Sequence, residues 1–197
     1  MTEQIPHTRR TKVRRAHQRA SYDKHKVIEL VEDVKLGHLA MIIDGQPLVM
    51  PITLWAHNNS LYLHVANRNR IQRYLEAGNQ VCISICEATE WVLAKSAYSH
   101  STNYRSAVLY CTGERVTDME EFDQSFKTCI NQIEEDRWQK VREPNEKERK
   151  VTALMRLTIV EGSYKARTGG PNEEPGDEDL PIESGLKKIC PFHQKQA

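Results

Sequence analysis

The sequence lacks any apolar run of about 18 residues, so no stretch of it is a candidate for a membrane-spanning helix. The basic stretch at its start is not followed by an apolar core, and we therefore expect no secretory signal. The five cysteines are odd in number and show no framework spacing, which argues against a disulfide scaffold. Together these absences predict a cytoplasmic protein that keeps its thiols reduced.

Glycine-rich loops that cradle phosphates are also missing. The sequence has no GxGxxG and no Walker-type motif, so these modes of nucleotide binding are unsupported. Cys190 and His193 have no partner cysteine pair at zinc spacing, and no base is ordered beside a nucleophilic cysteine. We therefore expect neither a metal site nor a Cys/His hydrolase.

The formal net charge is only +1, but the charged residues are unevenly distributed. Residues 1–20 are basic and nearly free of large apolar side chains, which predicts a flexible arm, and residues 171–197 are typical of an acidic, loosely structured tail. Residues 21–170 then form a single domain. No aromatic or helix-turn-helix pattern accompanies the basic arm, so we expect neither a nucleic-acid partner nor a membrane partner.

Local signals predict a helix and a hairpin at the start of the domain. Asp23 can cap a helix over residues 23–35, which Gly37 ends. Asp44-Gly45 between two apolar runs predicts a hairpin of strands 39–43 and 48–55. Pro51 lies inside the second strand, and because proline cannot donate to a ladder, this strand is at an edge or bulged.

The rest of the pattern is mainly β. We expect a short helix over residues 71–77 and a longer helix that Asp118 caps, with a further capping pattern at residues 144–147. Strands are expected at residues 61–65, 81–86, 91–94, 108–111 and 151–160, with 81–86 and 91–94 pairing across 87–90. Six to seven strands with short connections and three helices predict an antiparallel β-barrel with short helices on its outside.

Two polar stretches are candidates for ligand binding. Asn69 and Arg70 stand at a helix start, where free N–H groups and the helix dipole suit a phosphate. An ordinary solvated basic helix is the alternative. His64, at the end of the preceding strand, either faces the ligand or caps the sheet.

The second polar stretch is residues 96–108, which carries hydroxyls, a histidine, two tyrosines and an arginine. Arg105 next to Ser106 suits a ligand rich in oxygen, and a solvated loop is the alternative. Lys165 and Arg167 alternate after the last expected strand, so they share a face if that strand continues. Otherwise they form a basic strand end in solvent.

Five segments in order carry a resemblance to a known family. They are Gly-His-Leu-Ala at 37–40, Asp-Gly-Gln-Pro-Leu-Val-Met-Pro at 44–51, Leu-Tyr-Leu-His at 61–64 with Asn69-Arg70, Leu-Ala-Lys-Ser-Ala-Tyr-Ser-His-Ser-Thr-Asn-Tyr-Arg-Ser at 93–106, and Lys-Ala-Arg-Thr-Gly at 165–169. Between them the chain resembles the pyridoxamine 5′-phosphate oxidase-like flavoproteins with the FMN-binding split-barrel fold, in the flavin-nucleotide-binding and nitroimidazole-reductase-related branch. The resemblance implies a homodimer with two flavins in clefts between the subunits.

The resemblance also implies a set of cofactor-binding residues. The strand around residues 50–53 would lie along the isoalloxazine through its backbone, Asn69 and Arg70 would hold the phosphate, and His64 would lie near the flavin. The full set is Met50, Pro51, Ile52, Thr53, His64, Val65, Asn69, Arg70, Tyr104, Arg105, Ser106, Lys165 and Arg167. Val65 and Arg68 stand where the branch usually has small residues. Their larger side chains would narrow the cleft or change its charge.

By this resemblance the protein is expected to bind FMN and to act as an oxidoreductase on a small molecule, with the redox chemistry supplied by the flavin. The sequence offers no counterpart of the substrate-binding residues of true pyridoxamine phosphate oxidases, so that reaction is not expected. Alternatives on the same fold are a flavin-binding or sensing protein without turnover, and a protein that uses FAD or a deazaflavin. A heme-handling relative is a further alternative, with His64, His100 and His193 as candidate ligands.

Overall fold

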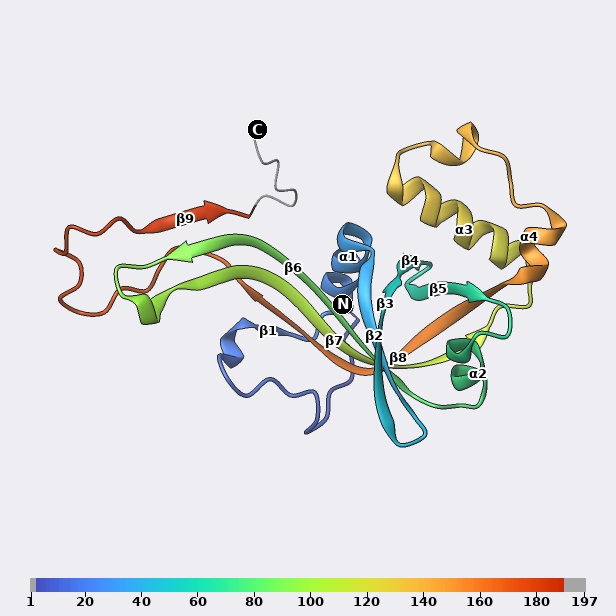
Figure 1. Cartoon of the computed structure of the whole chain (residues 1–197), viewed down its shortest axis with the longest axis horizontal. Helices are drawn as coiled ribbons and strands as arrows, with labels where there is room; N and C mark the ends of the chain where they lie inside the picture. The colour runs from blue at the N-terminus through green and yellow to red at the C-terminus, as the bar shows by residue number, and fades with distance from the viewer. Residues whose placement is uncertain (1–2, 190–197) are drawn as a thin grey trace.

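The computed structural model describes residues 3–189, and within them nine strands form one antiparallel sheet with flanking helices. The strand order is β3-β2-β6-β7-β8-β5-β4, while β1 pairs with β8 and β9 pairs with β6 (Figure 1). The sheet does not close, because β3 and β4 remain at opposite ends of this order. The predicted mainly β split barrel is confirmed, with more strands than the sequence indicated.

In chain order the helices and strands are η1 His17–Arg19, β1 Ala20–Ser21, α1 Lys24–Val34, β2 Leu36–Ile43, β3 Gln46–Thr53, β4 Trp55–His57, β5 Ser60–Ala66, α2 Arg70–Glu76, β6 Val81–Leu93, η2 Ala97–Ser99, β7 Ser101–Arg115, α3 Met119–Ile133, η3 Arg137–Lys140, α4 Glu146–Val151, β8 Thr152–Arg167 and β9 Gly185–Lys188. Among the helices of residues 3–189, none combines the length and the apolar character that a membrane crossing requires.

Every second side chain along the strands points into the core on the inner face of the sheet. On β5, Leu61, Leu63 and Val65 point inward and are buried, because successive side chains of a strand point to opposite faces. Val27 and Leu30 of α1 pack into the same core. Burying each such side chain stabilises the fold by about 1.5–3 kcal/mol.

A second, smaller cluster lies on the outer face of the sheet. Trp55 of β4 and Tyr62 of β5 pack there against Phe122 and Phe126 of α3. Asp118 caps α3, as the sequence predicted, by accepting the backbone N–H of Glu120. The cap fixes where α3 begins, and the aromatic cluster fixes which face of the sheet it covers.

Most local predictions are confirmed. Asp23 caps α1, Asp44 and Gly45 form the turn of the β2–β3 hairpin at positive φ, and β3 with Pro51 is an edge strand. One helix end differs, since Lys35, at φ 56°, is the C-terminal cap of α1 and Gly37 already belongs to β2.

The central strands differ more from the prediction. Residues 81–86 and 91–94 are not two strands but parts of one continuous strand, β6, with a bulge between Ala88 and Glu90. The polar residues that suggested a turn are paired across the ladder, because Arg105 of β7 donates to Glu87 and Asn103 donates to Glu90. The polar stretch 96–108 is likewise mostly strand, and β7 begins at Ser101.

The described part of the basic N-terminal stretch lies against the sheet rather than projecting from it. Ile5 is buried, and the Glu161 carboxylate of β8 accepts from the hydroxyls of Thr8 and Thr11, at 2.5 and 2.9 Å, and from Nε of Arg10 at 2.8 Å. These hydrogen bonds, with that of Thr8 first, lower the pKa of Glu161 to about 2. The sequence did not indicate these contacts.

The acidic C-terminal stretch also makes contacts that its composition did not indicate. β9 pairs with the far end of β6, and Lys95 donates its backbone N–H to Glu173 and its ammonium to the carbonyl of Leu180. In Figure 1 the β6–β7 hairpin and β9 extend together well beyond the barrel.

The Glu161 contacts predict a pH-dependent attachment of the N-terminal segment. Glu161→Gln should lower the melting temperature and speed tryptic cleavage within residues 9–15. The pKa of Glu161 is lower in the folded protein than in the unfolded chain. Its carboxylate therefore stabilises the folded state fully above the ordinary carboxyl pKa of 4.5, and this stabilisation is lost as the pH falls towards 2. The difference in melting temperature between wild type and variant should therefore shrink over this range, whereas Glu146→Gln, an exposed control on α4, should show no such difference. A constant difference from pH 7 to pH 2 would contradict the assignment.

Candidate functional site

The cofactor-binding residues expected from the sequence fall into two groups at different places on the sheet. Residues 50–53, 64–65 and 69–70 lie on β3, on β5 and at the start of α2. Residues 104–106, 165 and 167 lie on β7 and β8. β2 and β6 separate β3 from β7 in the strand order. β5 does pair with β8, but only with its first residues, 152–157, whereas Lys165 and Arg167 lie at the other end of that strand. The fold of one chain therefore does not bring the two groups together.

The edge strand β3 offers its backbone more than its side chains. Met50 and Ile52 pack against the core, while Pro51 and Thr53 are exposed. β2 pairs with one side of β3, and within residues 3–189 no strand pairs with its other side. A ligand lying along this free edge would therefore meet peptide groups, which is the mode of contact that the sequence comparison implied.

At the start of α2, one of the nominated polar residues is already engaged. The side chain of Asn69 accepts the backbone N–H of Ile71 at 2.9 Å and so caps the helix. Arg68 adopts φ 66° and its N–H donates to Gln72. Asn69 thus shapes the turn, and Arg70 is left as an exposed charge beside it.

On β5, the two neighbouring candidates point to opposite faces. Val65 is 8% exposed and belongs to the inner core, so its side chain does not line an outer cleft. His64 points outward, where its ring lies 5.9 Å from that of Trp55 and 5.6 Å from that of Phe126. The rest of the imidazole is open to the surface.

The aromatic packing sets the charge of His64. Withdrawal from water against these rings lowers the pKa of His64 below its ordinary value of 6.5. Neither ring nitrogen makes a hydrogen bond within the part of the chain that the structure describes. The side chain is therefore a neutral imidazole at pH 7 whose nitrogens are open to an external group.

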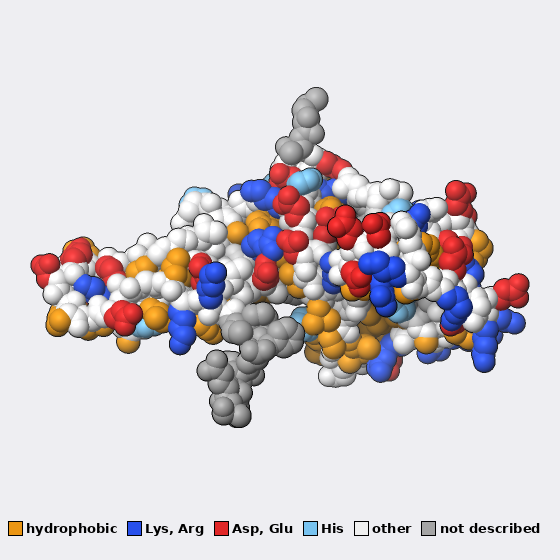
Figure 2. Space-filling model, turned by 90° about the horizontal axis from the view of Figure 1, so that it is seen from above, with side chains coloured by type: hydrophobic (Ala, Val, Ile, Leu, Met, Phe, Trp, Pro, Cys, Tyr) orange, Lys and Arg blue, Asp and Glu red, His pale blue; other side chains and the backbone are white. Residues whose placement is uncertain are grey.

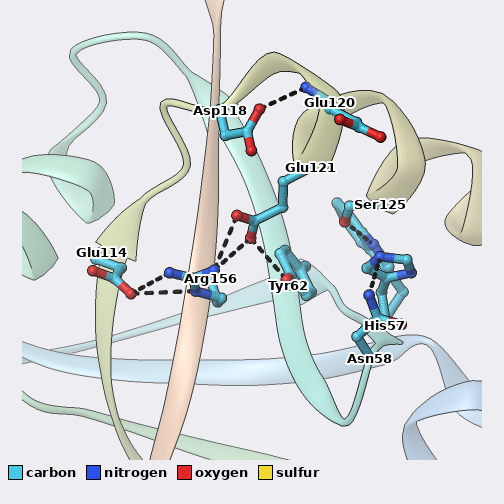
Figure 3. Close-up of polar contacts among 10 residues, drawn as sticks. His57, Asn58, Tyr62, Glu114, Asp118, Glu120, Glu121, Ser125 and Arg156 are labelled. Carbon is cyan, nitrogen blue, oxygen red and sulfur yellow. Dashed lines mark hydrogen bonds and ion pairs between the residues drawn. The ribbon is translucent and has the colours of Figure 1, made fainter.

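A polar network fixes α3 and hence the rings around His64. Trp55 Nε1 donates to Ser125 Oγ at 2.9 Å, and the Tyr62 hydroxyl donates to Glu121 at 2.9 Å. Figure 3 shows Arg156 of β8 bridging Glu121 and Glu114, at 2.8 and 2.7 Å. Burial, followed by the hydrogen bond to Glu121, raises the pKa of Tyr62 to about 12, so the phenol remains a donor.

Over the half of the molecule that contains α3 and α4, acidic and basic side chains are interspersed (Figure 2). Several of them form ion pairs, including Arg149 with Asp123 and Arg142 with Glu148. This surface therefore presents no field of one sign that would attract a charged polymer. The sequence did not nominate Trp55 or Phe126, although the alternation of Tyr62 and His64 on one strand could have indicated an outer aromatic face.

The β7–β8 register separates Arg105 from its neighbours. Tyr104 pairs with Arg167 and Ser106 with Lys165, so these four side chains share one face of the ladder. Arg105 lies on the opposite face, where it bonds Asp33 at 2.8 Å and Glu87. Its charge is therefore already compensated, and residues 104–106 do not line a single cleft.

Lys165 and Arg167 share a face, as the alternation predicted. Lys165 Nζ donates to the backbone carbonyl of Arg15 at 3.0 Å. Arg167 is buried and donates to Asn103 and to the carbonyls of Gly169 and Gly170. The N-terminal segment and the turn after β8 thus enclose this basic pair.

Of the other histidine candidates, His100 follows η2 and is exposed, with Nδ1 at 3.0 Å from the carbonyl of Ser96. His193 and Cys190 lie outside the described residues. Within residues 3–189 no group of three or more His, Cys, Asp or Glu side chains is arranged to hold a metal ion.

The unclosed antiparallel sheet, with its free edge strand and outer helices, defines a split-barrel protein. The chain belongs to the family described as pyridoxamine 5′-phosphate oxidase, whose model matches residues 23–166. No curated protein matches the chain in sequence.

Solved structures share the fold over most of the chain. The flavocytochrome Anf3 from Azotobacter vinelandii is 28% identical, with a TM-score of 0.83 over 94% of this chain and 87% of that one. A FAD and heme binding protein from Mycobacterium smegmatis is 21% identical, with a TM-score of 0.78 over 91% and 90%. A proposed 5-nitroimidazole antibiotic resistance protein from Bacteroides thetaiotaomicron is 18% identical, with a TM-score of 0.62 over 86% and 89%.

The environment of His64 predicts an altered titration. In an NMR titration, His64 should titrate below 6.5, and Phe126→Ala should raise its pKa towards that value because water then reaches the ring. Ile133→Ala, which truncates an exposed residue of the same helix, should leave the titration unchanged. Circular dichroism would establish that α3 remains folded in both variants. A wild-type His64 that titrates at 6.5 or above would overturn this account.

Proposed function

We propose that this protein is a homodimeric flavoprotein that carries out redox chemistry on a small molecule, with its flavin between the subunits. The observation that carries the proposal is the separation of the two groups of nominated residues within one chain. All of these residues except Arg167 lie inside residues 23–166, the segment that matches the family model. A second copy, related by two-fold symmetry, could supply the β7–β8 group next to the β3 edge of the first.

The surface between the two groups suits such a partner. Ile42 of β2 is 55% exposed, Val49 of β3 is 60% exposed and Val108 of β7 is 40% exposed. The strand register places these three side chains and Pro51 on the same, outer face of the sheet, because residues paired across neighbouring strands point to the same face. Exposed apolar side chains that share a sheet face are typical of surfaces that bind another protein.

The residues of the β3 edge fit a flavin. The free peptide groups of β3 can bond the edge of a planar heteroaromatic ring. Arg70 is exposed and forms no ion pair within residues 3–189, so its charge is available for a phosphate. A bound flavin supplies the electron transfer, and the chain supplies position and electrostatics. FMN is the flavin that the sequence resemblance implied, and FAD is the alternative that the name of the FAD and heme binding protein from Mycobacterium smegmatis supports.

The visible spectrum of the purified protein, followed by identification of the released cofactor, tests this proposal. A flavin spectrum with released FMN or FAD is expected, and Arg70→Gln should weaken flavin binding about 10- to 100-fold through loss of a charged hydrogen bond. Lys127→Gln, an exposed residue of α3, is the matched control and should bind flavin as the wild type does. A colourless protein that does not bind added FMN or FAD would contradict the proposal.

Heme binding is a second candidate, because His64 is neutral, partly open and free of protein hydrogen bonds within the described residues. These are the properties of an imidazole that can ligate iron. The support from relatives is that the 28% identical Azotobacter protein is a flavocytochrome.

Addition of heme, followed by absorption spectroscopy, tests this second candidate. A shifted Soret band is expected for wild type and for His100→Ala, and its loss is expected for His64→Ala. A Soret band unchanged by His64→Ala would exclude His64 as the ligand.

A further inference from the structure

A polar cavity lies between the N-terminal segment and the turn that follows β8. It has a volume of about 440 Å³, and its walls include Gln18 and Arg19 of the N-terminal segment, Arg167 at the end of β8, and the turn residues 168–172. The pairing of Ala20 with Lys165 holds the two walls at their relative positions.

Arg167 is the unusual feature of this cavity. It is only 7% exposed, yet its hydrogen-bond partners are the neutral amide of Asn103 and the carbonyls of Gly169, at 2.9 Å, and Gly170, at 2.8 Å. No carboxylate forms an ion pair with it within residues 3–189. A buried charge is costly unless an opposite charge compensates it, and three bonds leave part of the five-donor guanidinium unassigned.

The other charges around the cavity do not supply that compensation. Arg19 is half-buried and forms no ion pair among the described residues. Lys165 bonds only a backbone carbonyl of the N-terminal segment. No acidic side chain lines the cavity within the described residues. Glu90 accepts from Asn103, and Glu173 accepts from the backbone N–H of Lys95. The local balance is therefore positive.

The turn beside Arg167 is open to a ligand. Gly169 has φ +102°, and a Cβ on Gly169 or Gly170 would meet no atom within 4 Å. The carbonyls of both glycines face Arg167, so the turn contributes open space beside the guanidinium rather than N–H donors. Two arginines on the walls of one cavity are donors that bind phosphate oxygens.

We propose that this cavity binds a phosphate group, held by Arg19 and Arg167. The phosphate belongs either to the pyrophosphate of a dinucleotide cofactor or to a separate nucleotide. The proposal rests in part on the proposed function, because Arg167 belongs to the β7–β8 group. It uses neither the β3 edge nor Arg70, so the two proposals can fail separately.

Isothermal titration calorimetry of the full chain with sodium pyrophosphate, and separately with ADP, tests the site. Wild type should bind at least one of these probes, and Arg19→Gln should weaken that binding about tenfold or more through loss of a charge-assisted hydrogen bond. Arg14→Gln, in the same basic stretch but outside the cavity, should stay within about twofold of wild type. No binding of either probe, or equal loss in both variants, would overturn the proposal.

Titration of the flavin-free protein with FAD and FMN then distinguishes the two sources. Weaker binding of FAD but not of FMN in Arg19→Gln would assign the phosphate to a dinucleotide cofactor. Unchanged binding of both flavins, with weaker pyrophosphate or ADP binding, would assign it to a separate nucleotide. If the protein binds no flavin, the pyrophosphate and ADP titrations still decide whether the phosphate site exists.

Discussion

The rest of the structure depends on the long antiparallel ladder of β6, β7 and β8. These strands run for 13, 15 and 16 residues, longer than the barrel that they help to build. One half carries apolar residues such as Ile83 and Leu109 inward, and the other half continues past the barrel with polar side chains paired across strands. In this polar half, backbone hydrogen bonds between the strands hold the ladder together. The part of the ladder beyond the barrel therefore needs no hydrophobic core of its own.

The cavity beside Arg167 and the surroundings of His64 both depend on contacts made by β8 of this ladder. The outer face of β8 holds Glu161, which fixes the N-terminal segment, and Arg167, which closes the cavity beside that segment. The same strand, nearer its start, holds Arg156, which anchors α3 through Glu121. Anchoring α3 keeps Phe126 against His64, and the exclusion of water there keeps the imidazole neutral.

The basic N-terminal stretch shows how composition and structure diverge. Six of its residues carry a positive charge, which is typical of a solvated arm. Buried Ile5, the hydroxyls of Thr8 and Thr11, and the carboxylate of Glu161 nevertheless hold it against the sheet. Because that carboxylate stands 151 residues away from Arg10, no local pattern could indicate the pairing.

What the sequence determined by itself is local. Asp23, Asn69 and Asp118 cap their helices, and Asp44-Gly45 turns the hairpin, because these conformations depend on side chains within a few residues of one another. The ordered segments also identified the family and its split barrel. What only the tertiary structure decided is the direction and the partner of each polar side chain. Cross-strand partners far away in the sequence decide the continuity of β6, the opposed faces of Arg105 and its neighbours, and the buried charge of Arg167. Before such a partner is known, a polar residue within a strand has the sequence signature of a turn.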